Sequence, residues 1–302
     1  MSSISASCNT QVDSKNVLII GGDSTIGSAL KKRLRIEGYK VTGTTRSHQR
    51  HHDSSAVYLD LSNPASFSSI QGLYYDVVVF CASIASIKEC EDNPEQTSLI
   101  NVDATMILLR ILGDSGSYLV FLSTNMVFDG SKPCVPSREQ PNPDTEYGRQ
   151  KAIVESWLLL EYPHSSVIRL TKVLHSRMPL FTDWLDRLRS GLRIYPFANR
   201  LMAPISLHLA IDSILWLVTH KLCGIFQVSS NCDVSYADAA FELANLSTAD
   251  SNLVIPVTLL LDRPADGSAT PPTAYASLEF SSAFASISPP PKPLESIRSV
   301  FQ

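Results

Sequence analysis

The chain has 302 residues, a formal net charge of −4 at pH 7 and a hydrophobic content of 44%. This length suits one large domain, or a large domain with a smaller lobe, and the composition is apolar enough for a sizeable core. The weakly acidic balance argues against a general nucleic-acid binder. No apolar run reaches the roughly 18–20 residues needed to cross a bilayer, so we expect no membrane partner.

Residues 1–15 are polar and rich in serine, without the apolar core of a signal peptide. We therefore expect a disordered leader on a cytoplasmic protein. The six cysteines include no C-x-x-C pair and no zinc-ligand spacing, which indicates incidental thiols in a reducing compartment. The cluster His48–His52 is interpreted as a solvated turn, so no metal is expected.

Strand-like and helix-like segments alternate along the first half of the chain. Short apolar strands are predicted at residues 17–20, 40–44, 57–59, 76–81, 118–123 and 167–170, and helices at 26–37, 97–113 and 145–161. This alternation predicts βαβ units and therefore an α/β fold with a Rossmann-type, doubly wound parallel sheet. Ligands of such sheets bind outside the carboxyl ends of the strands.

The second half of the chain is less regular. We expect a dinucleotide-binding Rossmann domain over residues 16–172, and a mixed segment over 173–302 that forms a small substrate-binding lobe and returns to the core. Within that segment the pattern predicts helices at 207–220 and 236–244, a late strand at 223–228 and a terminal helix after Pro291. Residues 174–203 have no clear strand pattern.

A glycine-rich turn over residues 21–27 joins the first predicted strand to the first predicted helix. Gly21 allows the tight turn, Gly27 lets the helix pack close to the strand, and the helix N-terminus faces a pyrophosphate. Ser24 stands where the usual pattern has its middle glycine, and its hydroxyl could itself contact a phosphate. An ordinary βα turn is the alternative interpretation.

Tyr147 and Lys151 lie four residues apart and thus on one face of a predicted helix. A fixed ammonium beside a phenol favours the phenolate, so we expect a lowered pKa for Tyr147. Such a phenol exchanges a proton with a carbonyl or alcohol oxygen near neutral pH. A solvated helix face is the alternative.

With these segments in place, residues 121–130 (FLSTNMVFDG), Pro141–Pro143 and residues 147–151 (YGRQK) resemble a family pattern. The pattern is S-T-D-Y-V-F-D-G, a proline-rich loop and Y-G-x-x-K. It belongs to the dTDP-4-dehydrorhamnose reductase group of extended short-chain dehydrogenase/reductases. The resemblance runs from about Val17 to the C-terminus.

By that resemblance, Thr124 holds the substrate carbonyl, Tyr147 donates the proton, and Lys151 grips the nicotinamide ribose and tunes Tyr147. The chain departs from the pattern after the threonine, where the family's Asp-Tyr pair is Asn125-Met126. Those family residues face the sugar, so the departure puts the substrate in doubt. The substrate-binding residues expected are Ser83, Asn125, Met126 and Tyr147.

The choice of cofactor is predicted from the end of the second strand. Residues 44–47 contain no carboxylate for a ribose 2′-hydroxyl, whereas Arg46 suits a 2′-phosphate, which favours NADP(H) over NAD(H). The predicted cofactor contacts are Gly21, Ser24, Thr25, Ile26, Gly27, Arg46, Asp60, Leu61, Cys81, Ala82, Ser83, Asn101, Ser123, Tyr147, Lys151, Leu170 and Thr171.

These features favour an NADPH-dependent reductase of a carbonyl group, on a 4-keto-deoxysugar nucleotide as small-molecule substrate. The alternatives are a non-catalytic NADP-binding regulatory subunit, a reductase of a non-sugar carbonyl compound, and a sugar epimerase with tightly held NAD. The complete set of Thr124, Tyr147 and Lys151 argues against a pure binder, and Arg46 argues against the epimerase. A homodimer is left open beside a monomer.

Overall fold

The structure is a computed structural model that describes residues 15–47, 56–258 and 274–302. The leader predicted over residues 1–15, apart from Lys15, and the cluster His48–His52 lie outside the described residues. In the described parts of the chain, no helix is both long enough and apolar enough to cross a membrane.

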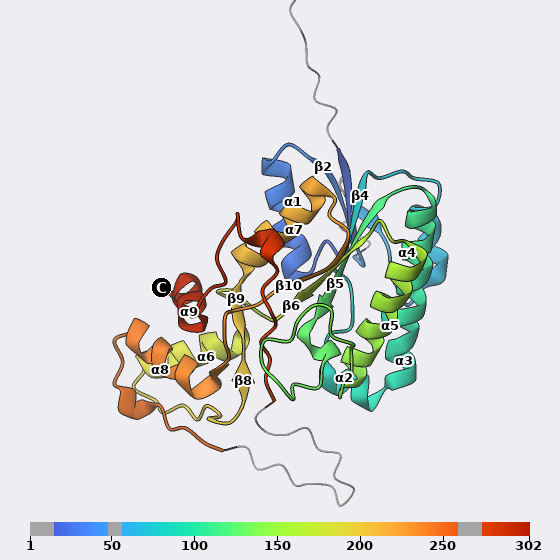
Figure 1. Cartoon of the computed structure of the whole chain (residues 1–302). Helices are drawn as coiled ribbons and strands as arrows, with labels where there is room; N and C mark the ends of the chain where they lie inside the picture. Colours follow the sequence, from blue (N-terminus) through green and yellow to red (C-terminus); the bar gives the residue numbers. More distant parts are fainter. Residues whose placement is uncertain (1–14, 48–55, 259–273) are drawn as a thin grey trace, which may run out of the picture.

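A seven-stranded sheet in the order β10-β6-β5-β4-β1-β2-β3 forms the centre of the molecule (Figure 1). All its neighbouring strands are parallel, and the chain enters at β1 and builds outwards in both directions. The predicted doubly wound fold class is thus confirmed. The strands are β1 (Asn16–Ile20), β2 (Lys40–Thr45), β3 (Ala56–Tyr58), β4 (Val77–Phe80), β5 (Tyr118–Thr124), β6 (Ser166–Leu170) and β10 (Gly224–Val228).

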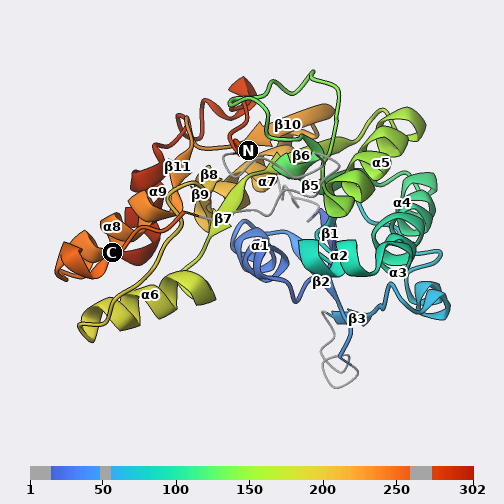
Figure 2. The ribbon, with the colours of Figure 1, turned by 90° about the horizontal axis from the view of Figure 1, so that it is seen from below.

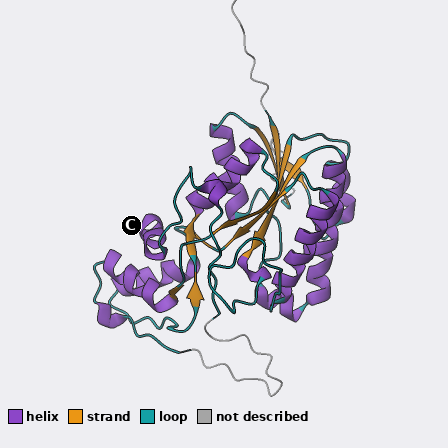
Figure 3. Ribbon diagram, in the orientation of Figure 1, coloured by secondary structure: helices purple, strands orange, loops and turns teal. Residues whose placement is uncertain are grey.

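Helices cover both faces of the sheet (Figure 3), so the central strands are buried on both sides and carry continuous apolar runs. One face holds α1 (Thr25–Ile36) and α7 (Leu207–His220), and the other holds α4 (Thr105–Asp114) and α5 (Glu146–Glu161). Alternate residues of β1 separate accordingly between two apolar clusters. The sheet therefore lies in a fixed layer between two cores.

The helix predicted over residues 97–113 is confirmed as a helical span, but this span is not one regular α-helix. The structure has α2 (Ile87–Asp92), α3 (Pro94–Ser98), a π-helical segment η3 (Leu99–Ala104) and then α4. The hydroxyl of Thr105 also donates to the carbonyl of Ile100, in the π-helical segment, at 3.0 Å. An apolar period of 3.6 residues cannot reveal the wider π turn, in which Asn101 is buried.

Short strands and helices form a lobe beside the carboxyl ends of the central strands (Figure 2). Residues 174–203 show no clear strand pattern in the sequence, and the strands that reach into this range have only two or three residues, too few for a period to be detected. The elements are β7 (Lys172–Leu174), α6 (Pro179–Arg189), β8 (Leu201–Met202), β9 (Pro204–Ser206), β11 (Val234–Ser235), α8 (Tyr236–Leu246) and α9 (Pro293–Phe301). Short 3-10 turns are η2 (Pro64–Ser69), η4 (Asn125–Val127), η5 (Ser251–Leu253) and η6 (Ser282–Phe284).

Helix α5 is held against the sheet at two points. Near its N-terminus, Gly148 lies so close to η4 that a Cβ there would be 1.9 Å from the carbonyl oxygen of Met126. Near its middle, the buried Glu155 accepts from the guanidinium of the buried Arg169 on β6, with a shortest contact of 2.7 Å. These contacts fix α5 against the ends of β5 and β6.

We expect Gly148→Ala to lower the free energy of unfolding by about 1–3 kcal/mol, because the new methyl group would overlap the carbonyl of Met126. Glycine to alanine in an unconstrained helix has the opposite effect, a gain of about 0.5–1 kcal/mol. Urea denaturation of both proteins measures the difference. Ser156→Ala, at an exposed position of the same helix, is the matched control. A Gly148→Ala protein as stable as the parent would contradict the close approach.

Candidate active site

The glycine-rich turn after β1 brings the ends of three strands together. Gly21 has φ +85°, and a Cβ there would be 2.8 Å from the backbone nitrogen of Ala82, just after β4. The amide of Gly21 donates to the hydroxyl of Thr44 on β2 at 2.9 Å. Gly27 is equally constrained, since its Cβ would lie 2.2 Å from the carbonyl oxygen of Gly21. Only glycine fits at these two positions, so the turn packs closely against the end of β4 and the start of α1.

Ser24 caps α1 within this turn. Its hydroxyl donates to the carbonyl of Gly21 at 2.7 Å and accepts from the amide of Gly27 at 3.0 Å. The Ser24 hydroxyl therefore makes its hydrogen bonds within the protein, whereas the sequence suggested a contact with a phosphate. Thr25 and Ile26 follow as the first residues of α1, where helix geometry leaves amides unpaired and favours a negative charge.

The end of β2 carries both signs of charge. Arg46 is exposed there, as the sequence analysis requires of a 2′-phosphate ligand. A carboxylate that the sequence analysis missed also lies at this end, because the hydroxyl of Thr45 donates to Asp23 at 2.5 Å. Asp23 comes from the glycine-rich turn, so the local sequence of β2 gives no sign of it. The next strand ends near Asp60, whose carboxylate accepts from the amide and hydroxyl of Ser62.

Lys151 lies in the narrow space between α5 and β5. Its side chain is buried, its Nζ donates to the carbonyl of Leu122 at 2.9 Å, and it lies 4.5 Å from the ring centre of Phe121. Burial lowers the pKa of Lys151 to about 8, while the carboxylate of Glu155 opposes this by raising it. The ammonium form therefore predominates at neutral pH and is held within 5.9 Å of the ring centre of Tyr147.

The lowered pKa predicted for Tyr147 is wrong for this structure. Burial raises the pKa of Tyr147, a hydrogen bond with the hydroxyl of Ser83 opposes that rise, and Cys90 adds to it. The ammonium of Lys151 points at the carbonyl of Leu122, which limits its effect on the phenol. Desolvation of the phenolate outweighs the nearby charge, so Tyr147 is a protonated phenol at neutral pH.

The segment after β5 presents the residues that depart from the family pattern. The hydroxyl of Thr124 accepts from the amide of Met126 at 3.2 Å and lies 3.4 Å from the side-chain oxygen of Asn125. Thr124 thus caps η4, and this structural role accounts for its buried hydroxyl. Asn125 and Met126 are partly exposed beside it.

Ser123, the residue before Thr124, has a different environment. Its hydroxyl oxygen is buried and has no hydrogen-bond partner among the residues that the structure describes. A buried hydroxyl without a partner is costly in a protein interior. It lies at the carboxyl end of β5, where this class of sheet binds ligands. A polar group of a bound dinucleotide at this edge would give that hydroxyl a partner, so the residue fits the cofactor.

The remaining predicted cofactor contacts lie at the same edge of the sheet, but their polar groups differ in whether the protein already binds them. Asn101 is committed to the protein, because its side-chain amide pairs with both backbone groups of Ile84 and with Gln150. Cys81 is a poor nucleophile, since burial raises its pKa to about 12. Thr171 donates its amide to the carbonyl of Val228.

Two apolar contacts complete that group. Leu170 is paired in register with Thr124, and Leu61 packs against the core on the α4 and α5 side. Neither offers a polar group from its side chain, so each can only shape the walls of a site. Among the residues that the structure describes, no three His, Cys, Asp or Glu side chains are grouped to hold a metal.

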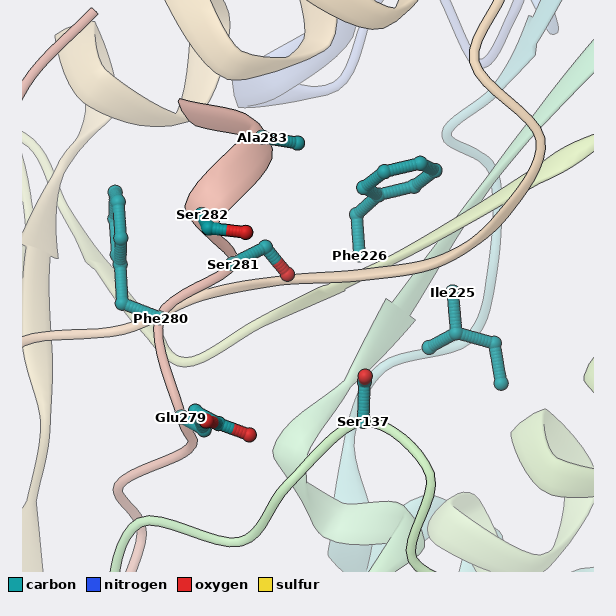
Figure 4. A pocket seen from close by; sticks show the side chains of 8 residues that line it. All are labelled: Ser137, Ile225, Phe226, Glu279, Phe280, Ser281, Ser282 and Ala283. Carbon is teal, nitrogen blue, oxygen red and sulfur yellow. The ribbon is translucent and has the colours of Figure 1, made fainter. Parts of the chain in front are cut away.

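A cavity of about 280 Å³ lies away from these residues, along the outer edge of β10 (Figure 4). None of the predicted site residues lines it. We therefore base the candidate active site on the chemistry at the strand ends and not on this cavity. Its walls are Ser137, Ile225, Phe226, Glu279, Phe280, Ser281, Ser282 and Ala283.

The chain is similar to known proteins over most of its length. A protein of Haloferax volcanii named "Probable low-salt glycan biosynthesis reductase Agl14" is 26% identical over 256 residues, which cover 82% of this chain and 85% of that protein. Methionine adenosyltransferase 2 subunit beta of Xenopus laevis is 30% identical over 161 residues. That match covers 53% of this chain and 47% of the relative, so the chain matches about half of that protein's length.

Among solved structures, dTDP-4-dehydrorhamnose reductase of Bacillus anthracis in complex with NADP superposes with a TM-score of 0.80. It is 19% identical, and the match covers 95% of this chain and 97% of that one, a likeness that shows the fold. The model of the RmlD substrate binding domain family matches residues 15–285, most of the chain. The resemblance seen in the sequence is confirmed, and the chain belongs to the RmlD substrate binding domain family.

Proposed function

We propose that the chain is an NADP(H)-dependent oxidoreductase of the extended short-chain dehydrogenase/reductase type that reduces a carbonyl group on a nucleotide-activated sugar. The observation that carries the proposal is the juxtaposition of Tyr147, Ser83 and the buried ammonium of Lys151 at the strand ends. It is supported by the family and by the reductase names of the Haloferax volcanii and Bacillus anthracis proteins.

The cofactor site of this proposal uses polar groups at the strand ends. The amides of Thr25 and Ile26, at the N-terminus of α1, would hold the pyrophosphate. Arg46 would hold the 2′-phosphate, and the hydroxyl of Ser123 would gain a partner. NADPH, when bound, supplies the hydride.

The proton comes from Tyr147. The phenol carries its proton at neutral pH, which is the form that a general acid needs in the reductive direction. Burial raises its pKa and so weakens it as an acid, and the contact with the hydroxyl of Ser83 opposes that rise. A carbonyl that accepts a hydride builds negative charge on its oxygen, and donors placed beside that oxygen stabilise it. The hydroxyl of Ser83 and the ammonium of Lys151 keep positive polarity near the phenol after it has given up its proton.

The sugar-binding part of the site differs from the family pattern. Asn125 offers an amide, whereas Met126 offers no hydroxyl where the pattern has a tyrosine. We propose that the substrate is a 4-keto-deoxysugar nucleotide that needs no hydrogen bond from position 126. A non-sugar carbonyl compound is the competing substrate class for the same chemistry.

A non-catalytic regulatory subunit is the second candidate function. It is favoured by the 30% identity to methionine adenosyltransferase 2 subunit beta over about half of each chain. Tyr147 discriminates between the two candidates, because a pure binder has no use for a positioned proton donor. Both candidates would bind NADPH, so a binding measurement alone does not distinguish the enzyme from the regulatory subunit.

We also propose a homodimer through the outer face of α4 and α5. Ile107 on α4 and Ile153 and Leu160 on α5 are exposed, and Leu160 has 78% of its surface accessible. Residues 153 and 160 share a helix face with Trp157, which stacks under Arg110 of α4. Light scattering should give twice the chain mass for the parent and one chain mass for Leu160→Glu. A monomeric parent at micromolar concentration would rule out this interface.

Replacing Tyr147 with phenylalanine tests the proposed acid. Turnover in NADPH oxidation should fall by about 10²–10⁴-fold, because the ring remains and only the transferable proton is lost. The affinity for NADPH, measured by calorimetry, should barely change. The parent's affinity for NADPH should also weaken above about pH 8, as Lys151 loses its charge.

Tyr74→Phe is the matched control, since Tyr74 is exposed on the surface and far from α5 in the chain. Undiminished turnover by the Tyr147→Phe protein would remove Tyr147 from the mechanism.

Arg46→Ala tests cofactor choice. The parent should bind NADPH more tightly than NADH, and the variant should narrow that difference, because the 2′-phosphate loses a charge-assisted partner. Without the charge of Arg46, the carboxylate of Asp23 at the same strand end should repel the 2′-phosphate and lower the affinity for NADPH. Calorimetry with both nucleotides measures the two affinities. Equal affinities in the parent would refute the assignment of Arg46.

A further inference from the structure

Gln150 is a buried amide that the proposed mechanism does not use. It lies on α5 between Tyr147 and Lys151, and its side chain is fully buried. A glutamine is rarely this buried unless its amide is bonded on both sides. Every polar atom of this side chain has a partner, and the partners belong to three different parts of the chain.

The nitrogen of the Gln150 amide faces the segment around α3. It donates to the hydroxyl of Thr97 at 2.9 Å and lies 3.3 Å from the carbonyl of Pro94. It also donates to the carboxylate of Glu146, in the first turn of α5, at 2.8 Å. These bonds tie the turn that carries Tyr147 to a separate helix.

The oxygen of the Gln150 amide faces η3. It accepts from the side-chain nitrogen of Asn101 at 2.7 Å. The same Asn101 accepts from the amide of Ile84 at 2.8 Å and donates to its carbonyl at 2.9 Å. Asn101 thus fixes the backbone of Ile84 from both sides, and Ile84 follows directly after Ser83.

Ser83 is the residue whose hydroxyl bonds to the phenol of Tyr147. The chain of contacts therefore forms a closed loop that runs from Gln150 through Asn101 and Ile84 to Ser83, and back to α5 at Tyr147. The network therefore joins the loop after β4, which carries Ser83, to the first turn of α5, which carries Tyr147.

We propose that Gln150 is a positioning residue, which acts through Asn101 and Ile84 to hold the hydroxyl of Ser83 against the phenol of Tyr147. This inference rests on the proposed function, because it assigns Gln150 a part in the same proton transfer. A misplacement of about 1 Å at a reacting group can cost 10²-fold in rate, so the network has a measurable effect on turnover.

The titratable groups that act on Tyr147 or on its neighbour Lys151 come from three parts of the fold. Glu155 and Lys151 itself lie on α5, Cys90 lies on α2, and Cys81 follows β4. Cys90 raises the pKa of Tyr147, as burial does. Among the causes of the Tyr147 pKa shift, only the bond from Ser83 lowers it, so loss of that bond moves the titration of Tyr147 to higher pH.

Gln150→Met tests the proposal, because it keeps the length of the side chain and removes every hydrogen bond. Turnover should fall by about 10- to 100-fold with little change in the KM for NADPH. In protein labelled with ¹³C at Cζ of tyrosine, the Tyr147 signal, assigned with Tyr147→Phe, should titrate at higher pH than in the parent. This second readout needs no substrate, so it decides the role of Gln150 even if the reductase proposal fails.

Ser229→Ala is the matched control. The hydroxyl of Ser229 is also fully buried and bonded on both sides, but its partners are Ser230 and Leu278. It should lose stability without moving the titration of Tyr147. If Gln150→Met does not fold, turnover and the Tyr147 titration are measured in Gln150→Asn, which keeps the amide group on a shorter side chain. Unchanged turnover and an unchanged Tyr147 titration in a folded Gln150 variant would overturn the proposal.

Discussion

The site depends on the buried ion pair between Arg169 on β6 and Glu155 on α5. The two side chains are 1% and 2% exposed, and Arg169 also donates to the carbonyl of Ser137 and to Gln227. Removing one partner of such a pair typically costs about 3–5 kcal/mol, because the other charge is left buried and alone. The pair therefore admits a single position of α5 relative to β6. Gly148 adds a steric limit at the other end of the contact, where no side chain larger than hydrogen fits.

With α5 fixed, the chemistry of the site follows from burial. Lys151 is buried, and its ammonium donates a hydrogen bond to the carbonyl of Leu122. Burial lowers its pKa to about 8, only slightly above neutral pH. Burial also raises the pKa of Tyr147, one turn earlier. The same burial thus strengthens the hold of the phenol on its proton and weakens the hold of the ammonium on its charge, which the carboxylate of Glu155 partly restores. The hydroxyl of Ser83 supplies the directional contact.

The sheet and the active-site motif could be predicted from the sequence because both are local patterns. Strand periods, the glycine-rich turn and the spacing of Tyr147 and Lys151 are visible without any knowledge of tertiary contacts. The features that were missed are long-range. Asp23 reaches the end of β2 across 22 residues, and Gln150 meets Asn101 across 49. The pKa of Tyr147 was predicted in the wrong direction because adjacency in sequence shows a charge but not the depth of its burial.

The central claim is that this protein moves a hydride from NADPH to a carbonyl. The most direct measurement is to incubate the protein with a panel of 4-keto-deoxysugar nucleotides and with NADPH that carries deuterium on C4 of the nicotinamide. Mass spectrometry of the products then shows whether the deuterium has been transferred. We predict a product in which a hydroxyl group replaces the keto group and deuterium is bound to the former carbonyl carbon. NADPH binding with no deuterium transferred to any keto-sugar nucleotide or simple ketone would contradict the claim and favour a regulatory subunit.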